Sequence, residues 1–360
     1  MGKKVLMKGN EAVAEAAIRA GCRLYFAYPI TPQSELIEYM AKMMPKANGT
    51  FLQAESEVAA INMVYGASGT GKRVMTSSSS PGISLKMEGI SYIAGANLPA
   101  VIINVQRGGP GLGDIQPAQG DYFQATKGGG HGDYRLIVLA PNSVQEFADM
   151  ADQAFDLADK YRNPVMILSD GLLGQMMEPV EFKPKKTDEE IAELNKQHLS
   201  WAMYPNQDEP NHHHHEINSL EIDPNVLEKH VLALAAKYKK IEENEIMLEE
   251  YNINDDNEYL CVAFGTASRI VKAAIDQLNE EGENIGLIRP ITVWPFPTEN
   301  IHKAIHGKVK KVMVFELNLG QMLEDVKLAV NGEKPVEFYG KVGGVVFTPE
   351  EVKQFIEKHL

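Results

Sequence analysis

Short apolar runs that alternate with helical patterns fill the first half of the chain, and this order restricts the fold more than any other feature. The runs, rich in apolar or β-branched residues, lie at 24–28, 73–76, 100–105, 136–139 and 165–168. Runs of this length predict strands, and the helical segments between them are long enough to serve as crossover connections. We therefore predict an α/β fold with a parallel sheet.

The later part of the chain predicts a second α/β unit. Its expected strands lie at 259–264, 284–288 and 312–315, and a helix ends the chain. Between the two units the composition becomes charged and amphipathic, and a helix is expected from 225 to about 250. We predict a first domain at 1–182, a charged helical arm or linker at 183–256 and a second domain at 257–360.

Composition excludes several classes of protein. A net charge of −14 opposes binding to nucleic acid or to an anionic membrane, because both require clustered lysine and arginine. Cys22 and Cys261 are the only cysteines, which excludes a disulfide framework and an iron–sulfur cluster held by this chain alone. A reducing cytoplasm fits this usage, and no run reaches the ~18 apolar residues that a membrane span needs.

The histidines at 212–215 are the one run that could capture a metal ion. Nothing nearby supplies the groups that orient the ligands of a structural metal site. We therefore read the run as a polar, flexible loop and expect no metal ligand in this chain.

The segment Tyr28-Pro29-Ile30-Thr31-Pro32 follows the first expected strand. Thr31 is predicted to cap the next helix and Pro32 to occupy its first position, since both residue types are favoured there. This segment therefore lies at the carboxyl end of a strand, where open α/β sheets bind their ligands.

Three further polar groups follow short apolar segments in the same way. Glu55 and Glu57 stand at the start of a helix, where a carboxylate most often only complements the helix dipole. The serines at 77–80 could bind a cofactor or cap the next helix. Arg107 opens a glycine-rich loop and could pair with a carboxylate, or it could be an ordinary surface arginine.

Taken together, these pieces resemble the alpha subunit of 2-oxoacid:ferredoxin oxidoreductases. The motifs that carry the resemblance in the first unit are Tyr28-Pro-Ile-Thr-Pro32, Glu57 with the helix that ends in Gly66-Ala67, Ser77 to Gly82, Arg107-Gly-Gly-Pro-Gly and Asp170-Gly171. In the second unit they are Gly265-Thr266, Trp294-Pro-Phe-Pro297 and Glu316 before Gly320. The resemblance implies a thiamine diphosphate-binding domain of the pyrimidine type, followed by a transketolase C-terminal-like α/β domain.

In that family this subunit holds the pyrimidine half of the thiamine diphosphate, and a beta subunit holds the diphosphate and Mg²⁺. The sequence agrees, because the Gly-Asp-Gly pattern with a later Asn that binds magnesium and diphosphate does not occur. The resemblance also implies a gamma subunit and a ferredoxin-like subunit with [4Fe-4S] clusters, ferredoxin as electron acceptor and coenzyme A as co-substrate.

The resemblance assigns roles to individual residues. Its distance from Gly66-Ala67 matches Glu57, and not Glu55, to the family's glutamate. A carboxyl group bonded to a ring nitrogen of the aminopyrimidine favours the tautomer that removes the thiazolium C2 proton. Thr31 and Arg107 match positions that contact substrate and cofactor, and Arg107 is expected to hold the carboxylate of the 2-oxo acid. Tyr28, Pro29, Ile30 and Ser79 are expected to contact the cofactor.

The loop after Arg107 bears on the substrate. Residues 108–126 contain no lysine or arginine that could bind the second carboxylate of 2-oxoglutarate, and they offer the apolar side chains Leu112, Ile115, Tyr122 and Phe123. We favour oxidative decarboxylation of branched-chain 2-oxo acids such as 2-oxoisovalerate, which gives acyl-CoA and CO₂. The alternatives are a pyruvate or 2-oxoglutarate type of the same family, another thiamine-dependent lyase or synthase, or a non-catalytic scaffold subunit.

Overall fold

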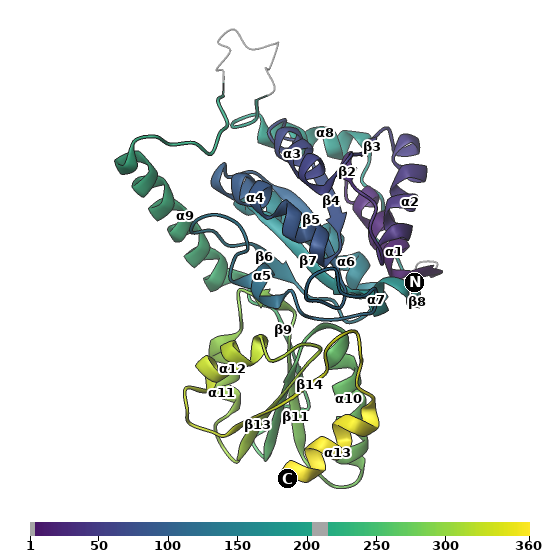
Figure 1. Cartoon of the computed structure of the whole chain (residues 1–360), viewed down its shortest axis with the longest axis vertical. Helices are drawn as coiled ribbons and strands as arrows, with labels where there is room; N and C mark the ends of the chain where they lie inside the picture. The colour runs from purple at the N-terminus through teal and green to yellow at the C-terminus, as the bar shows by residue number, and fades with distance from the viewer. Residues whose placement is uncertain (1–3, 204–214) are drawn as a thin grey trace.

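Seven strands form the sheet of the first domain, in the order β12-β6-β7-β5-β4-β2-β3 (Figure 1). The computed structural model describes residues 4–203 and 215–360. The strands are β2 (Leu24–Ala27), β3 (Thr50–Gln53), β4 (Val74–Ser78), β5 (Ala100–Gln106), β6 (Ile137–Leu139), β7 (Pro164–Asp170) and β12 (Thr292–Trp294). All neighbours are parallel except β12 and β6, so the predicted parallel sheet is confirmed.

Helices cover both faces of this sheet, as the crossover connections of a parallel sheet require. The helices of the first domain are α1 (Gly9–Arg19), α2 (Ser34–Met43), α3 (Glu57–Ser68), α4 (Ser80–Gly95), α5 (Tyr122–Thr126), α6 (Val144–Tyr161) and α7 (Gly171–Gln175), with a short 3₁₀ helix at Pro45–Ala47. α1 packs against α6, and α3 packs against α4. The central strands β5 and β7 are buried at every residue, which explains why both are apolar up to their polar carboxyl ends.

Two strands at the start and end of the first domain were not predicted. β1 (Val5–Lys8) and β8 (Met177–Val180) pair antiparallel as a separate two-stranded sheet. Their residues are largely exposed or half-buried, and β1 has an apolar run of only three residues, so the pattern of a buried strand does not mark them in the sequence.

The second domain contains a five-stranded sheet in the order β14-β13-β10-β11-β9. Its strands are β9 (Leu248–Tyr251), β10 (Tyr259–Ala263), β11 (Ile285–Pro290), β13 (Lys311–Glu316) and β14 (Val336–Gly340). Its helices are α10 (Gly265–Glu280), α11 (Thr298–Ala304), α12 (Met322–Val330) and α13 (Pro349–His359). The three predicted strands of this unit and its final helix are therefore present.

The segment between the domains contains α8 (Asp188–His198) and α9 (Pro224–Asn244), and α9 runs along one side of the first domain toward the second (Figure 1). The expected helix to about residue 250 is wrong at its end, because β9 follows and pairs antiparallel with β11. Glu249 is an ion-pair partner of Arg289 on β11, at 2.7 Å, rather than a solvated helix residue. Residues 212–214 of the histidine run lie outside the described residues, and His215 bonds the carbonyl of Ala202 through its Nδ1 at 2.9 Å.

Gln119 joins the two domains through its backbone and its side chain. Its N–H donates to the carbonyl of Leu317 at 3.0 Å, and its Nε2 donates to the carbonyl of Phe264 at 2.9 Å. Its Oε1 accepts the N–H of Leu317 at 3.0 Å. Within the part of the chain that the structure describes, no helix is long and apolar enough to cross a membrane.

Candidate functional site

The predicted site residues meet at the carboxyl edge of the first sheet. Tyr28 to Thr31 follow β2, Glu57 follows β3, Ser79 follows β4 and Arg107 follows β5. Because these strands are parallel, their carboxyl ends share one edge, as the sequence predicted. Tyr28, Pro29 and Thr31 are exposed there and Ile30 is half-buried, so this part of the edge is open.

The first turn of α4 connects Glu57 with Arg107. The hydroxyl of Ser80 accepts the backbone N–H of Arg107 at 3.0 Å. A Cβ atom on Gly82 would lie 2.8 Å from Oε1 of Glu57 and 2.1 Å from Oγ of Ser78. Only a glycine therefore lets these two side chains approach the helix so closely.

Burial distinguishes the two candidate glutamates. Glu57 is 7% exposed, whereas Glu55 lies in solvent. Glu55 precedes α3 and Glu57 is its first residue. The Ser56 hydroxyl caps this helix, since it accepts the N–H of Ala59 at 3.1 Å. A glutamate that only complemented the helix dipole would stay in water, so the burial of Glu57 favours a binding role.

Arg107 is 8% exposed, and the reading of an ordinary surface arginine is wrong. Its Nη1 donates to the carbonyl of Thr31 at 2.9 Å, and its Nη2 donates to the carbonyl of Leu112 at 3.0 Å. Its Nε is buried without a partner, and no carboxylate among the described residues forms an ion pair with it. A buried guanidinium without a counter-charge fits an anionic ligand.

Other polar atoms at this edge are also buried without a partner among the described residues. They are Oγ of Ser78, Oγ of Ser79 and Nε2 of Gln33. Ser79 is the N-cap residue of α4, yet its side chain makes no capping bond. Buried polar groups normally have partners, so these atoms fit a polar ligand such as the expected aminopyrimidine, which both donates and accepts hydrogen bonds.

Thr31 does not cap α2, and that prediction is wrong. The N–H of Gln33 donates to the carbonyl of Ile30 at 3.2 Å, which closes a backbone turn over residues 30–33. The helix begins only after this turn, at Ser34, and Gln33 is its N-cap residue. Thr31 is therefore exposed in the open part of the edge, and its carbonyl accepts a hydrogen bond from Arg107.

The apolar residues expected beside the substrate divide into two pairs. Leu112 and Ile115 are 79% and 55% exposed on the loop that contacts Arg107, so both are free to face a ligand or a partner. Tyr122 is fully buried at the domain junction, and its hydroxyl donates to Oδ2 of Asp325 at 2.6 Å. Phe123 is half-buried, and its N–H donates to Gln321 at 2.7 Å. The expectation that Tyr122 lines the site is therefore wrong.

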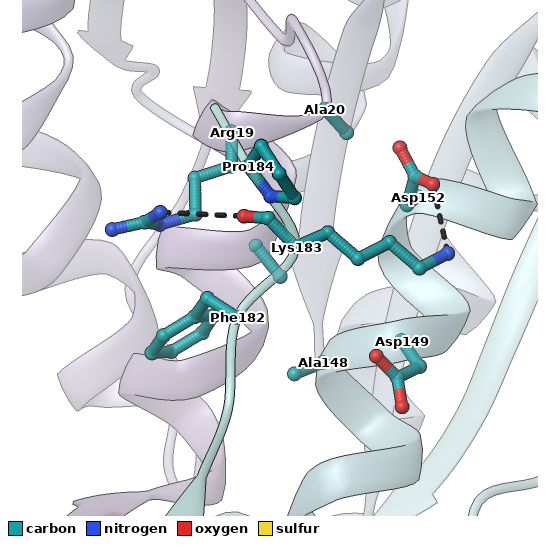
Figure 2. Close-up of a pocket in the computed structure, with 9 residues that line it drawn as sticks. Arg19, Ala20, Ala148, Asp149, Asp152, Phe182, Lys183 and Pro184 are labelled. Atoms are coloured by element: carbon teal, nitrogen blue, oxygen red, sulfur yellow. Dashed lines mark hydrogen bonds and ion pairs between the residues drawn. The ribbon is translucent and has the colours of Figure 1, made fainter. Parts of the chain in front are cut away.

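A separate hollow, drawn in Figure 2, lies where the chain after β8 crosses α1 and α6. Lys183 donates to Oδ2 of Asp152 at 3.0 Å, and the carbonyl of Lys183 accepts a bond from Arg19 at 3.3 Å. The cavity measures about 10 Å³, roughly the room of one water molecule. It cannot hold a cofactor.

One group of possible metal ligands occurs among the described residues, although none was expected. Ligand atoms of His302, His306 and Glu333 lie within 4.8 Å of one another on the second domain. All three are at least partly exposed, and such groups are common on surfaces without an ion. The absence of a metal ligand from this chain stays a prediction.

Sequence reasoning missed Gln33 and Lys86 at this edge, whereas Ser78 belongs to the serines at 77–80 that it singled out. Gln33 is fully buried and its Oε1 accepts the hydroxyl of Ser77 at 2.5 Å. Lys86 is also fully buried, on the face of α4 that packs against the sheet. A signal was present, because Lys86 follows Gly82 by one turn and precedes Ile90 by one turn on an otherwise apolar face.

Two family models together match most of the chain. The model described as "Pyruvate flavodoxin/ferredoxin oxidoreductase, thiamine diP-bdg" matches residues 15–248. The model described as "Pyruvate:ferredoxin oxidoreductase core domain II" matches residues 257–352. The first match contains all the residues at the carboxyl edge described above.

The chain is similar to known proteins over nearly its whole length. The ketoisovalerate oxidoreductase subunit VorB of Methanothermobacter thermautotrophicus is 48% identical, with 98% of this chain and 96% of that protein covered. The 2-oxoglutarate synthase subunit KorA of Methanocaldococcus jannaschii is 37% identical, with 98% and 99% covered.

Solved structures also resemble the chain. The 2-oxoglutarate:ferredoxin oxidoreductase from Magnetococcus marinus, with 2-oxoglutarate, coenzyme A and succinyl-CoA bound, superimposes with a TM-score of 0.84 at 29% identity. That match covers 99% of this chain and 65% of the other. A split-gene transketolase superimposes with a TM-score of 0.58 at 13% identity, which is a likeness of fold alone.

Proposed function

Because this chain belongs to the pyruvate flavodoxin/ferredoxin oxidoreductase family, as its motifs predicted, we propose that it is the alpha subunit of an enzyme for branched-chain 2-oxo acids. The reaction is oxidative decarboxylation of acids such as 2-oxoisovalerate to acyl-CoA and CO₂. The names of the relatives support this choice, since the ketoisovalerate subunits are 48% and 49% identical and the 2-oxoglutarate subunits 37% or less.

One observation carries the proposed chemistry: the buried Glu57 lies against Gly82, beside polar atoms that lack partners. These residues would hold the pyrimidine ring of thiamine diphosphate, with Ser79 as a hydrogen-bond partner. Glu57 would hold a proton at a ring nitrogen and so act as an acid–base group. When bound, the cofactor supplies the nucleophilic carbon that attacks the 2-oxo group.

Arg107 would hold the carboxylate of the 2-oxo acid. Two carbonyls accept hydrogen bonds from its Nη atoms, and these bonds fix the plane of the guanidinium without neutralising its charge. Thr31 would contact the substrate from the exposed turn after β2, and Tyr28, Pro29 and Ile30 would contact the cofactor. The exposure of this turn supports a site that a partner subunit closes.

The partners follow from what this chain lacks. A beta subunit would supply the diphosphate and Mg²⁺ site, and a gamma subunit and a ferredoxin-like subunit with [4Fe-4S] clusters would complete the enzyme. Both cysteines are buried and free, which supports electron transfer through other chains and a reducing, cytoplasmic setting. Ferredoxin would accept the electrons, and coenzyme A would accept the acyl group.

We retain the division into 1–182, 183–256 and 257–360 as a proposal. Two strands depart from this division, because β9 of the arm belongs to the sheet of the second domain and β12 of 257–360 pairs with β6 in the sheet of the first.

The test is reconstitution of the chain with its partner subunits. The complex is expected to reduce ferredoxin in the presence of 2-oxoisovalerate, coenzyme A and thiamine diphosphate. A preference for pyruvate or 2-oxoglutarate would show that the chain belongs to another substrate type of the same family. A complex that turns over a 2-oxo acid equally well without this chain would favour the scaffold alternative.

The chain alone is expected to bind thiamine diphosphate weakly, since it lacks the magnesium–diphosphate half of the site. Calorimetry with the purified chain, the cofactor and Mg²⁺ measures this. Micromolar binding without a partner would contradict the proposal that the site is shared.

A further inference from the structure

Lys86 on α4 is fully buried beneath the carboxyl edge of the first sheet. Its Nζ donates to Oγ1 of Thr76 at 2.7 Å and to the carbonyl of Ser77 at 2.9 Å. Both acceptors are uncharged, and both belong to the end of β4, directly before the polar residues of the candidate site. Burial of a charged lysine costs free energy unless a carboxylate compensates its charge, and no carboxylate among the described residues bonds Lys86 directly.

Glu57 is the charged group that acts on Lys86. Lys86 follows Gly82 by one helical turn, and the Glu57 side chain covers Gly82 from α3. Burial lowers the pKa of Lys86 to about 7, and the negative charge of Glu57 opposes this shift. From β4 only the hydroxyl of Thr76 and the carbonyl of Ser77 reach the amine.

The two charges act on each other without touching. Among the described residues no cation lies within ion-pair distance, 4.0 Å, of Glu57. A direct ion pair would occupy the carboxylate oxygens that must be free to hold a ring nitrogen. A buried cation beyond ion-pair distance stabilises the carboxylate and leaves both oxygens available.

We propose that Lys86 is a positioning residue for the reaction, which sets the charge state of Glu57 from beneath the site. The inference rests on the proposed acid–base role of Glu57. When Lys86 carries its proton, the Glu57 carboxylate is favoured. When Lys86 is neutral, the neutral carboxyl group is favoured, and the site then needs no uncompensated buried charge.

The first experiment measures the coupling in the full chain without partners. Lysine side chains are labelled with ¹³C, the Lys86 signal is assigned by its loss in K86M and in K86R, which keeps the positive charge, and its titration is followed by NMR. Replacing Glu57 by Gln is expected to lower the titration midpoint of Lys86 by about one pH unit or more, since a nearby opposite charge is lost. E55Q is the matched control, because Glu55 is exposed, and it is expected to leave the midpoint unchanged. An equal midpoint in wild type and E57Q would overturn the inference.

The second experiment measures the consequence in the reconstituted complex. In K86M the pH profile for exchange of the thiamine C2 proton is expected to move to higher pH by about one unit, because the site has lost the cation beneath the Glu57 carboxylate. An unchanged profile in a folded K86M complex would contradict the proposal. Loss of folding in K86M would not prevent a decision, because the E57Q titration keeps Lys86 in place.

Lys237 provides the matched control for this second experiment. It is half-buried on α9, its Nζ donates to Asn97 at 2.8 Å and to the carbonyl of Arg162 at 3.1 Å, and burial lowers its pKa to about 7. The charge that acts on Lys237 is Arg162 and not Glu57. K237M is therefore expected to keep the wild-type pH profile.

The two proposals fail separately. A wild-type complex that turns over no 2-oxo acid would overturn the proposed function, and the NMR titration would still decide the coupling. A complex that turns over 2-oxoisovalerate while Lys86 ignores Glu57 would overturn the inference about Lys86 alone.

Discussion

Glu57 and Gly82 lie against each other, with Oε1 of Glu57 2.8 Å from the point that a Cβ atom on Gly82 would occupy. The contact joins the start of α3 to the first turn of α4, and both helices begin at the carboxyl edge of the sheet. The space above Gly82 is therefore the place where the carboxyl group is held. Any side chain at Gly82 must displace both Glu57 and Ser78, whose Oγ would be only 2.1 Å away.

Replacing Gly82 by Ala is expected to impair the reaction more than it impairs folding. Helix propensity alone favours Ala by roughly 0.5–1 kcal/mol, but the new methyl group would push the Glu57 carboxyl out of its position. We expect kcat of the reconstituted complex to fall by about tenfold to a hundredfold, as for a misplaced catalytic group. Steady-state kinetics and the midpoint of thermal unfolding check the two effects.

Gly95 is the matched control in the same helix. A Cβ atom there would meet its nearest neighbour, Cβ of Ser219, at an ordinary 3.4 Å. G95A is expected to keep wild-type kinetics and to leave stability unchanged or slightly higher. Equal kinetics for G82A and G95A would show that Glu57 does not depend on the space over Gly82.

Replacing Glu57 by Gln is expected to lower both C2-proton exchange and turnover by roughly 10²–10⁴, the range for lost acid–base participation. The variant complex should still assemble, because the amide has nearly the shape of the carboxyl group. Hydrogen–deuterium exchange at thiamine C2, followed by NMR in the reconstituted complex, measures the step directly.

Glu55 is the control for this substitution, since it lies two residues earlier and is exposed. E55Q is expected to cost at most a few tenths to about 1 kcal/mol, the contribution of a charge near a helix terminus. If E57Q and E55Q both exchange at the wild-type rate, this chain does not activate the cofactor and the scaffold alternative gains support.

The outline of this site could be predicted from the sequence, because parallel strands bring their carboxyl ends to one edge whatever the details of packing. Glu55 and Glu57 could not be separated by helix-dipole arguments, since the distinction is one of burial. Burial depends on Gly82, which is 25 residues further along the chain. Long-range contacts of this kind leave no local pattern.

The errors have the same cause. Thr31 has the residue type of a helix cap, but a backbone bond from Gln33 to Ile30 makes a turn there instead. The segment around Glu249 reads as a helix surface, and its pairing with Arg289 on β11 makes it a strand. Tyr122 follows the loop of Arg107 closely, yet its bond to Asp325 in the second domain holds it away from the site. In each case a tertiary partner overrides the local preference.

Replacing Arg107 by Met is expected to weaken binding of the 2-oxo acid by roughly 1.5–3 kcal/mol, the range for a hydrogen bond to a charged group. The Michaelis constant should therefore rise about tenfold to a hundredfold. Cofactor binding, measured in the same complex by titration of thiamine diphosphate, should change little. An unchanged Michaelis constant would show that the carboxylate binds elsewhere.

R107K is the matched control, because lysine keeps the positive charge of Arg107 but lacks its planar guanidinium group. A lysine cannot donate to Thr31 and Leu112 and to a ligand in the same plane, so this variant should recover only part of the affinity. Full recovery would mean that Arg107 acts as a point charge and that its two bonds to carbonyls do not orient it.

The choice of substrate is expected to follow the loop at 108–126, which has no cation. The kcat/KM of the complex for 2-oxoisovalerate should exceed that for 2-oxoglutarate about tenfold or more, since an unpaired second carboxylate costs over ~1.4 kcal/mol. Initial rates with both acids over a range of concentrations give the ratio. Equal values would show that a cation of the partner subunit reaches the second carboxylate.

Glu316 is expected to make the stability of the second domain depend on pH. Glu316 is fully buried at the end of β13, and burial raises its pKa from 4.5 to about 7, although the N–H groups of Met322 and Leu323 donate to it at 2.8 and 2.9 Å. A carboxyl group whose pKa is raised by folding binds its proton more tightly in the folded chain than in the unfolded one. Below pH 4.5 both states are protonated and the group has no effect on stability.

Between pH 4.5 and about 7 only the unfolded state loses this proton, so the free energy of unfolding should fall by roughly 1–3 kcal/mol as pH rises. Urea unfolding of the chain at pH 5 and pH 7.5 measures the decrease. E316Q cannot titrate, and its decrease over the same interval should be smaller by that amount, while all other groups contribute equally to both proteins. If wild type and E316Q lose the same free energy between the two pH values, Glu316 is ionised in the folded chain and its three donors outweigh its burial.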